Sequence, residues 1–188
     1  NRLALASTEG DVFVVSTDTG ELLHRLHHPN TRVFTVSFLE NGSGAPLVVS
    51  GSMDGFVRFW NSDSGQPAKE HRVTSMSVFA LASAADGRIM ATCGNDLSIR
   101  VWRTSDMREL ASITIGDSAP CMSFIDNGKL LLRDGSRLVL WNPAEETVVL
   151  EFPERHDYRE FAVSPDGQRI AIPYGEHIRI VDGRPIEQ

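Results

Sequence analysis

Apolar and polar residues alternate with a period of two through most of this chain, in short runs separated by polar turns. The clearest run is FVRFW, where Val57 and Phe59 flank the polar Arg58. A side-chain period of two is typical of a β-strand with one well-buried face. No stretch of any length shows the period of about 3.6 residues that marks an amphipathic helix. The pattern therefore predicts an all-β chain of short strands.

The same run returns at nearly equal intervals. Trp60 is followed by Trp102 after 42 residues and by Trp141 after a further 39, while Val15 lies 45 residues before Trp60 and Val181 lies 40 residues after Trp141. An apolar residue stands one position before each of these five anchors: Val14, Phe59, Val101, Leu140 and Ile180. Another stands three positions before each: Val12, Val57, Ile99, Leu138 and Ile178. Self-similarity at such a period indicates repeated supersecondary units.

Each full unit also contains a hairpin signal ahead of its anchor. These are the pairs Asn41-Gly42, Asp86-Gly87, Asn127-Gly128 and Asp166-Gly167. Such dipeptides favour tight turns because both residues tolerate a positive φ. A further apolar run precedes each pair (VFTVSF, SMSVFAL, PCMSFI, FAVS), and a weaker run such as ELLHRL follows the polar turn after an anchor. The unit is predicted to be four short antiparallel strands.

These units resemble the WD-repeat (WD40) β-propeller family, in which a repeat of about 40 to 45 residues forms one four-stranded blade. VVSGSMDGFVRFW, ATCGNDLSIRVW and VSPDGQRIAI carry the resemblance, which covers essentially the whole chain. It implies that residues 1–188 form a single section of an all-β propeller, with one incomplete blade and four full four-stranded blades. The expected segments are 1–28 for the incomplete blade, then 29–72, 73–114, 115–152 and 153–188.

The two ends of the repeat array depart from the family pattern. The chain opens with NRLALAST at the second strand of a blade, and its last copy has Val181 where the anchor Trp would stand. We expect the chain to be a fragment of a larger ring, namely its C-terminal part. The remaining blades would then come from upstream sequence or from another chain.

Composition and charge limit the classes of partner. Hydrophobic residues make up 41% of the chain and charged residues 23%, and no apolar run approaches the roughly 18 to 20 residues that span a bilayer. The formal net charge of −7 argues against a nucleic-acid partner, although a local basic patch is compatible with it. Two cysteines, Cys93 and Cys121, fit a reducing compartment, with a single disulfide as the open alternative. We therefore expect a cytoplasmic protein that binds neither nucleic acid nor membrane.

Serine or threonine, histidine and aspartate recur together with tryptophan in two units. One set is His28, Ser50, Asp54 and Trp60, and the other is His71, Thr92, Asp96 and Trp102. A hydrolase triad would need an exposed serine oxygen beside an oxyanion hole, but these hydroxyls fall inside predicted strands and no G-x-S-x-G elbow is present. The resemblance implies a structural hydrogen-bond relay instead, from indole through hydroxyl and imidazole to carboxylate. We expect no catalytic residue.

The later units lack parts of this relay. Trp141 has no obvious histidine upstream in SITIGDSAP, and Asp134 is one residue out of register. We therefore expect the later blades to be held less firmly than the first two full ones.

Other candidate chemistry has a plainer interpretation. In HRLHH, a strand would turn His24 and His28 to one side and His27 to the other, so a solvated outer strand is favoured over a metal site. Cys93 and Cys121 lie in predicted strands and suit small core residues. The sequence therefore indicates no metal and no cofactor.

The family resemblance places the remaining functional candidates on one face. In this family, the loops that enter the innermost strand and the turns between the second and third strands gather around the central channel, and that face commonly takes up a peptide or protein. The corresponding residues here are Asn30, Thr31, Arg32, Met53, Arg72, Asn95, Arg133, Asp134, Tyr158, Arg159 and Tyr174. Arginine, methionine and tyrosine are enriched at protein interfaces.

The sequence thus predicts a non-catalytic interaction scaffold or sensor with a protein or peptide partner. One alternative is a propeller enzyme that acts on a small substrate at the central channel. Another is the regulatory domain of a multidomain ATPase or kinase.

Overall fold

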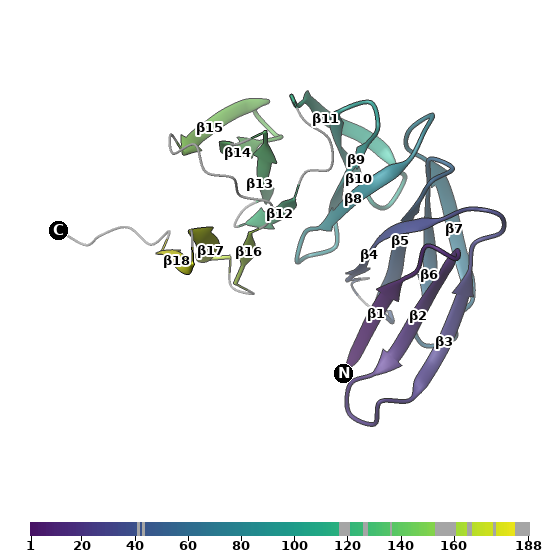
Figure 1. Ribbon diagram of the computed structural model, residues 1–188. Helices are drawn as coiled ribbons and strands as arrows, with labels where there is room; N and C mark the ends of the chain where they lie inside the picture. The colour runs from purple at the N-terminus through teal and green to yellow at the C-terminus, as the bar shows by residue number, and fades with distance from the viewer. Residues whose placement is uncertain are drawn as a thin grey trace.

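The structure is a computed structural model of the chain, and it describes residues 1–40, 42, 44–116, 121–125, 128–135, 137–152, 161–164, 167–174 and 176–182. The described strands form five antiparallel sheets. In Figure 1 these sheets follow one another in chain order as an arc, with the first and last sheets at its two ends. The predicted all-β propeller architecture is confirmed.

Each sheet is a meander of consecutive strands. The first contains β1 (Arg2–Ala6), β2 (Asp11–Ser16) and β3 (Leu22–His27). The second contains β4 (Val33–Leu39), β5 (Leu47–Ser52), β6 (Phe56–Asn61) and β7 (Pro67–Arg72). The third contains β8 (Val78–Ser83), β9 (Ile89–Gly94), β10 (Ser98–Arg103) and β11 (Arg108–Thr114). The fourth contains β12 (Met122–Ile125), β13 (Lys129–Asp134), β14 (Arg137–Asn142) and β15 (Thr147–Phe152). The fifth contains β16 (Ala162–Val163), β17 (Arg169–Tyr174) and β18 (His177–Asp182).

The strand count differs from the prediction in the last sheet. Four full four-stranded blades were expected, but the described residues form three four-stranded sheets and two three-stranded ones, at the first and last positions. The final residues, 183–188, lie outside the described ranges. In the first sheet, Leu3 of β1 is opposite Val15 just as Val48 of β5 is opposite Trp60. β1 therefore takes the place of a second strand, as predicted.

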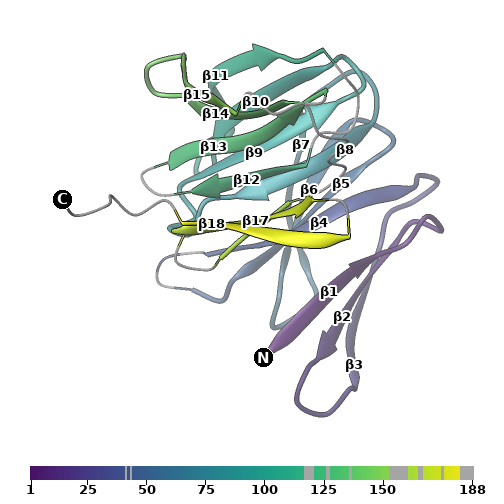
Figure 2. The ribbon, with the colours of Figure 1, turned by 60° about the vertical axis from the view of Figure 1, so that its left-hand side comes forward.

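Neighbouring sheets contact each other through their first strands. β4 packs beside β8, β8 beside β12 and β12 beside β16, while β1 contacts β4. Figure 2 shows the inner strands β4, β8 and β12 beside one another. Among the described residues, no helix combines the length and the apolar character that a bilayer crossing requires.

The core is divided into layers, one between each pair of neighbouring sheets. Val12 and Val14 pack with Val48 and Trp60 between the first and second sheets. Trp102 packs against the second sheet, and Trp141 packs against the third, in the same manner. The last layer joins the fourth and fifth sheets through four residues: Leu131, Leu138, Ile170 and Ile172. Both faces of an internal sheet are therefore covered. The polar residue of the alternating pattern, such as Arg58 between Val57 and Phe59, consequently also faces a neighbouring sheet.

Glycine in the turn between the second and third strands positions the loop that enters the next sheet. Gly55 has a φ of 84°, and a Cβ there would approach the Thr74 carbonyl oxygen to 2.3 Å. Gly10 has a φ of 90° and rests in the same way on the carbonyl of Thr31. Only glycine combines this backbone conformation with so close an approach. The turn and the incoming loop are thus held together as one surface.

Candidate functional site

The first candidate set forms a buried network in the second sheet. The indole Nε1–H of Trp60 donates to Ser50 Oγ at 3.0 Å, and His28 Nε2 lies 2.9 Å from the same oxygen. Ser50 belongs to β5, Trp60 to β6, and His28 follows β3 directly. Ser50 and His28 have no exposed surface. The structure therefore brings these three residues together between the first and second sheets.

Arg58 determines how the imidazole is protonated. Its NH1 lies 3.2 Å from His28 Nδ1, and because a guanidinium only donates, Nδ1 must accept. Nε2–H then donates to Ser50 Oγ, and the Ser50 hydroxyl donates to the Arg58 carbonyl at 3.4 Å. Burial, reinforced by the positive charge of Arg58, lowers the pKa of His28 to about 4. The imidazole is accordingly neutral at neutral pH.

The last step of the predicted relay is different in the structure. Asp54 was expected to receive the imidazole, but Arg58 lies between them and pairs with Asp54 Oδ2 through NH2 at 2.7 Å. Ser52 Oγ also donates to Asp54 at 2.6 Å. Burial would raise the pKa of Asp54, but hydrogen bonds from Arg58, Ser52 and the Phe56 amide hold it below its usual value. The side chain of Arg58 is long enough to reach both Asp54 and His28. The spacing of serine, histidine and aspartate along the chain gave no sign of this contact.

The second candidate set is incomplete. Trp102 Nε1–H donates to Thr92 Oγ1 at 2.8 Å, as expected, and Asp96 pairs with Arg100 at 2.7 Å. His71, however, meets Trp102 edge to face, with ring centroids 5.7 Å apart.

Strand register explains why His71 does not occupy the position of His28. His71 is opposite Val57, the place that Leu26 has opposite Val12. The backbone N–H of Val73 donates to the Gly55 carbonyl at 3.0 Å, just as that of His28 donates to the Gly10 carbonyl at 2.7 Å. Val73 is therefore the counterpart of His28.

The similar spacings in the two sets were misleading. His28 precedes Asp54 by 26 residues, and His71 precedes Asp96 by 25. β4 has 7 residues and β8 has 6, and the connection that follows β4 is also longer than the one that follows β8. The true counterpart of His28 is consequently closer in sequence to its aspartate.

The fourth sheet replaces the network with apolar residues. Leu132 is opposite Val139, the pair of positions that Ser50 and Arg58 occupy in the second sheet. Ile115 donates its backbone N–H to the Leu97 carbonyl at 2.8 Å and so takes the place of His28. The turn after β13 is one residue shorter than the turn after β5, and Asp134 therefore lies opposite Arg137.

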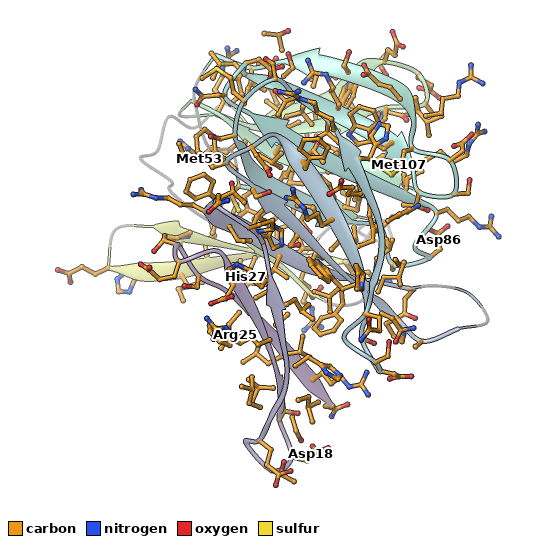
Figure 3. All side chains as sticks on the ribbon, turned by 90° about the vertical axis from the view of Figure 1, so that its right-hand side faces the viewer. Asp18, Arg25, His27, Met53, Asp86 and Met107 are labelled. Atoms are coloured by element: carbon orange, nitrogen blue, oxygen red, sulfur yellow. The ribbon has the colours of Figure 1, made fainter. Side chains whose placement is uncertain are left out.

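Backbone hydrogen bonds join neighbouring segments at the predicted partner face. The amides of Met53, Asn95 and Arg133 donate to the carbonyls of Arg32, Ser77 and Cys121 at 2.8, 3.1 and 3.0 Å. The bonds from Met53 and Asn95 each join the turn after a second strand to the loop that enters an inner strand, whereas Arg133 lies within β13 and its bond joins that strand to the residue before β12. Figure 3 shows Met53 on the opposite side of the molecule from Asp86 and Met107.

The other residues predicted for this face fall into three groups. Asn30 and Arg32 are exposed in the loop before β4, where Thr31 is partly buried. Arg72 ends β7 and donates to the Thr74 carbonyl at 3.2 Å, while Asp134 Oδ1 accepts the Gly116 amide at 2.6 Å. Tyr174 ends β17, and Tyr158 and Arg159 lie outside the described residues.

Met76 belongs on this face but was not predicted. Its side chain is 53% exposed, equal to that of Met53, and its sulfur lies 3.8 Å from Asn95 Nδ2. The sequence placed Met76 in the apolar run SMSVFAL, but β8 begins only at Val78, so Met76 lies in the loop before it. Nothing in that loop indicated which of its residues would face outward.

The three clustered histidines each have a different partner. His24 Nε2 contacts the Asp63 carbonyl at 2.9 Å, His27 Nδ1 contacts Asp11 at 2.9 Å, and His28 is in the buried network. In the part of the chain that the structure describes, no three His, Cys, Asp or Glu side chains gather as metal ligands. Cys93 is fully buried, and burial raises its thiol pKa to about 12. The Sγ atom of Cys121 lies 3.5 Å from the Phe161 carbonyl oxygen.

A concave region lies at the end of the inner strands opposite the predicted partner face. This cavity of about 810 Å³ is bounded by the turn after β8, by β12 and by β16. Its lining includes Ser83, Phe124 and Val163, with Asp86 and Arg88 paired at 3.7 Å.

Comparison with known proteins finds a known repeat in part of the chain. The model "WD domain, G-beta repeat" matches residues 20–61 and 66–103. Ribosome biogenesis protein YTM1 of Saccharomyces cerevisiae is 35% identical over 71 residues, which are 38% of this chain and 15% of that protein. Apoptotic protease-activating factor 1 of Danio rerio is 22% identical over 151 residues, which are 80% of this chain and 12% of that protein.

A solved structure shares the fold. A chain in the crystal structure of a mitotic checkpoint complex superposes with a TM-score of 0.78 at 18% identity, covering 95% of this chain and 56% of that chain. Our chain spans only 12% to 15% of the length of the two curated relatives above. The repeats, the blade-like sheets and the family match agree: this chain carries WD40 repeats at residues 20–61 and 66–103, and it has the β-propeller fold.

Proposed function

We propose that this chain is a non-catalytic interaction module, a scaffold or sensor that presents its loop face to a protein or peptide partner. The observation that carries the proposal is the pair of equivalent hydrogen bonds from Met53 and Asn95, which tie the turns after β5 and β9 to the loops that enter β4 and β8. They fix successive loops in one orientation, so that exposed Arg32 and Met53 side chains project from a preformed surface. A preformed surface loses little conformational entropy on binding, which favours recognition by docking.

The relatives support a role in assemblies. Their names refer to ribosome biogenesis and to a mitotic checkpoint complex, and WD40 propellers are typically protein-binding scaffolds. The particular partner, the pathway and a cytoplasmic location remain proposals for this chain.

The enzyme hypothesis has less support. The hydroxyls of Ser50 and Thr92 are buried and accept tryptophan indoles, so neither meets the exposure that a nucleophile requires. The cavity at the other end of the inner strands contains one described carboxylate, Asp86, which faces Arg88. A role as regulatory domain of an ATPase or kinase stays a prediction that the upstream sequence would test.

Capture of partners by the full-length protein tests the proposal. We expect the triple variant R32E/R133E/R159E to lose partners that the unmodified protein retains. The matched control, R88E/R103E/R108E, changes the net charge equally at the opposite ends of the third-sheet strands. Equal capture by both variants would contradict a role of the loop face.

A further inference from the structure

We propose that the loop face recognises an acidic segment of the partner in which an apolar side chain lies next to carboxylates. This inference rests on the proposed function and assigns the chemistry of the partner. Four residues would make the contact: Arg32, Met53, Arg72 and Met76, which we name the Arg–Met patch.

The Arg–Met patch is continuous although its members come from three different segments. The Met53 amide is bonded to the Arg32 carbonyl at 2.8 Å. A Cβ at Gly55, two residues after Met53, would lie 2.6 Å from the Met76 carbonyl oxygen, so the two loops touch there. Arg72 reaches into the same loop through hydrogen bonds to the Thr74 and Ser75 carbonyls at 3.2 and 3.4 Å. These contacts hold the three segments next to one another, with the turn that contains Met53 in the middle.

The apolar part of the patch is its two methionines. Met53 and Met76 are each 53% exposed on a face where the backbone is well ordered by its hydrogen bonds. A methionine side chain is unbranched and polarizable, so it adapts to apolar groups of different shapes. Two such side chains on adjoining loops offer a contact area for one apolar anchor.

The arginines of the patch differ from most others in their electrostatic partners. Among the described residues, neither Arg32 nor Arg72 has a carboxylate partner. Elsewhere arginines are paired with carboxylates: Arg2 with Asp63, Arg25 with Asp11, Arg58 with Asp54, Arg100 with Asp96, and Arg137 with Glu151. The chain contains 25 acidic and 18 basic residues, yet within the described residues no ion pair reaches these two arginines. Charge complementarity therefore points to carboxylates supplied by the partner.

Arg72 is also held in advance of binding. Its guanidinium lies 5.7 Å from the centroid of the Phe56 ring, in addition to its two carbonyl contacts. An arginine that is already immobilised loses less entropy when it meets a carboxylate.

Glu9 lies on the neighbouring turn of the first sheet and is exposed, so it should repel an acidic ligand. We therefore expect E9Q to strengthen binding.

Fluorescence anisotropy with the full-length protein tests this partner chemistry. The probe is a short labelled peptide with glutamates on both sides of a central leucine. One comparison peptide has lysine in place of glutamate, and another has glycine in place of leucine. We expect the glutamate–leucine peptide to bind about tenfold more tightly than either of the others. Its affinity should fall as the salt concentration rises.

Variants of the protein locate the binding. R32E should weaken binding of the glutamate–leucine peptide by about tenfold, and M53A/M76A by several-fold. R108E is the matched control, because Arg108 is exposed at the start of β11, outside the patch. R32E is preferred to R72E because Arg72 makes loop contacts that a substitution would disturb.

Several results would overturn the inference. These are equal binding of the lysine peptide, equal effects of R32E and R108E, and tighter binding of a single-stranded RNA of the same length. If R32E/R133E/R159E loses its partners but the acidic peptide does not bind, the loop face does bind partners and the proposed partner chemistry is wrong. If that triple variant keeps its partners, the proposed function fails as well.

Discussion

The second and third sheets share one backbone plan but satisfy their buried polar groups differently. In both sheets, a hydroxyl on the second strand accepts the indole N–H of a tryptophan on the third strand of the same sheet. The distance is 3.0 Å for Ser50 and 2.8 Å for Thr92. Beside Ser50 stands His28, whereas Val73 takes the corresponding place near Thr92. The hydroxyl–indole bond is thus common to both sheets, and the histidine is an addition in one of them.

The polar groups of the second sheet are linked to one another in a way that those of the third are not. Ser52 connects Asp54 to Arg58, but its counterpart in the third sheet is Gly94, where a Cβ would approach the Ser77 carbonyl oxygen to 2.9 Å. Val73 brings no polar group that would need a partner, so the third sheet leaves fewer buried groups to satisfy. Removal of one member should therefore cost more in the second sheet, because it orphans several others.

The largest expected difference is between S50A and T92V. Alanine at position 50 leaves both the Trp60 indole and the His28 imidazole without their shared acceptor, which should cost about 2 to 5 kcal/mol of unfolding free energy. Valine at position 92 keeps the shape of threonine and orphans only the Trp102 indole, at about 1 to 3 kcal/mol. Urea unfolding of both variants measures the difference. Equal losses would show that His28 does not depend on Ser50.

The next effect is a dependence of stability on pH that the second sheet alone should generate. The pKa of His28 is lowered from 6.5 to about 4 in the folded protein, so the unfolded chain takes up a proton first as the pH falls. Stability should therefore decrease between about pH 6.5 and 4, by up to about 3 kcal/mol. Arg58, Asp54, His27 and Asp11 all influence this imidazole.

H28Q provides the control for that measurement. Glutamine keeps a hydrogen-bonding side chain but does not titrate, so its stability curve should be flatter in this pH window. The pKa values of Asp54 and Asp96 are lowered, so their contribution is lost only as the pH falls below about 4. A wild-type slope that persists unchanged in H28Q would assign the pH dependence to other groups.

A smaller difference is expected between R58M and R100M. Each substitution removes the cation from two carboxylates, Asp54 and Glu70 for Arg58 and Asp96 and Glu109 for Arg100. Methionine at position 58 also leaves His28 Nδ1 without its donor. R58M should be the more destabilising by about 1 kcal/mol, the typical net value of one hydrogen bond. Thermal unfolding of the pair is sufficient, since both substitutions remove one charge. If R100M were the more destabilising, Arg58 would not be supporting the imidazole.

The sequence predicted the strands, the turns and the indole–hydroxyl pairs because these follow from local periodicity. Trp60 and Ser50, like Trp102 and Thr92, lie ten positions apart across a single hairpin of fixed register. The partner of the hydroxyl, in contrast, comes from the preceding sheet, and its spacing varies with loop length. That variation made His71 look like a counterpart of His28.

Two other features depended on side-chain direction, which local periodicity does not determine. Arg58 reaches from its strand to both His28 and Asp54, and only the folded backbone shows that one side chain can span them. Met76 is exposed on a loop whose backbone carbonyl at Met76 lies against Gly55 of a different turn. Long side chains and irregular loops thus account for what the sequence did not predict in the candidate site.

The smallest expected effect is the sharpest test of equivalence between the two sheets. If Val73 truly occupies the place of His28, a histidine there should find Thr92 Oγ1 on one side and Arg100 on the other, and V73H should cost only about 1 kcal/mol. Val78 is buried in the same core layer without that polar surrounding, so V78H should cost about 3 kcal/mol or more. NMR titration of V73H should also show an imidazole that stays neutral well below its usual pKa, as His28 does. Equal destabilisation by V73H and V78H would mean that the shared backbone register does not carry a shared side-chain geometry.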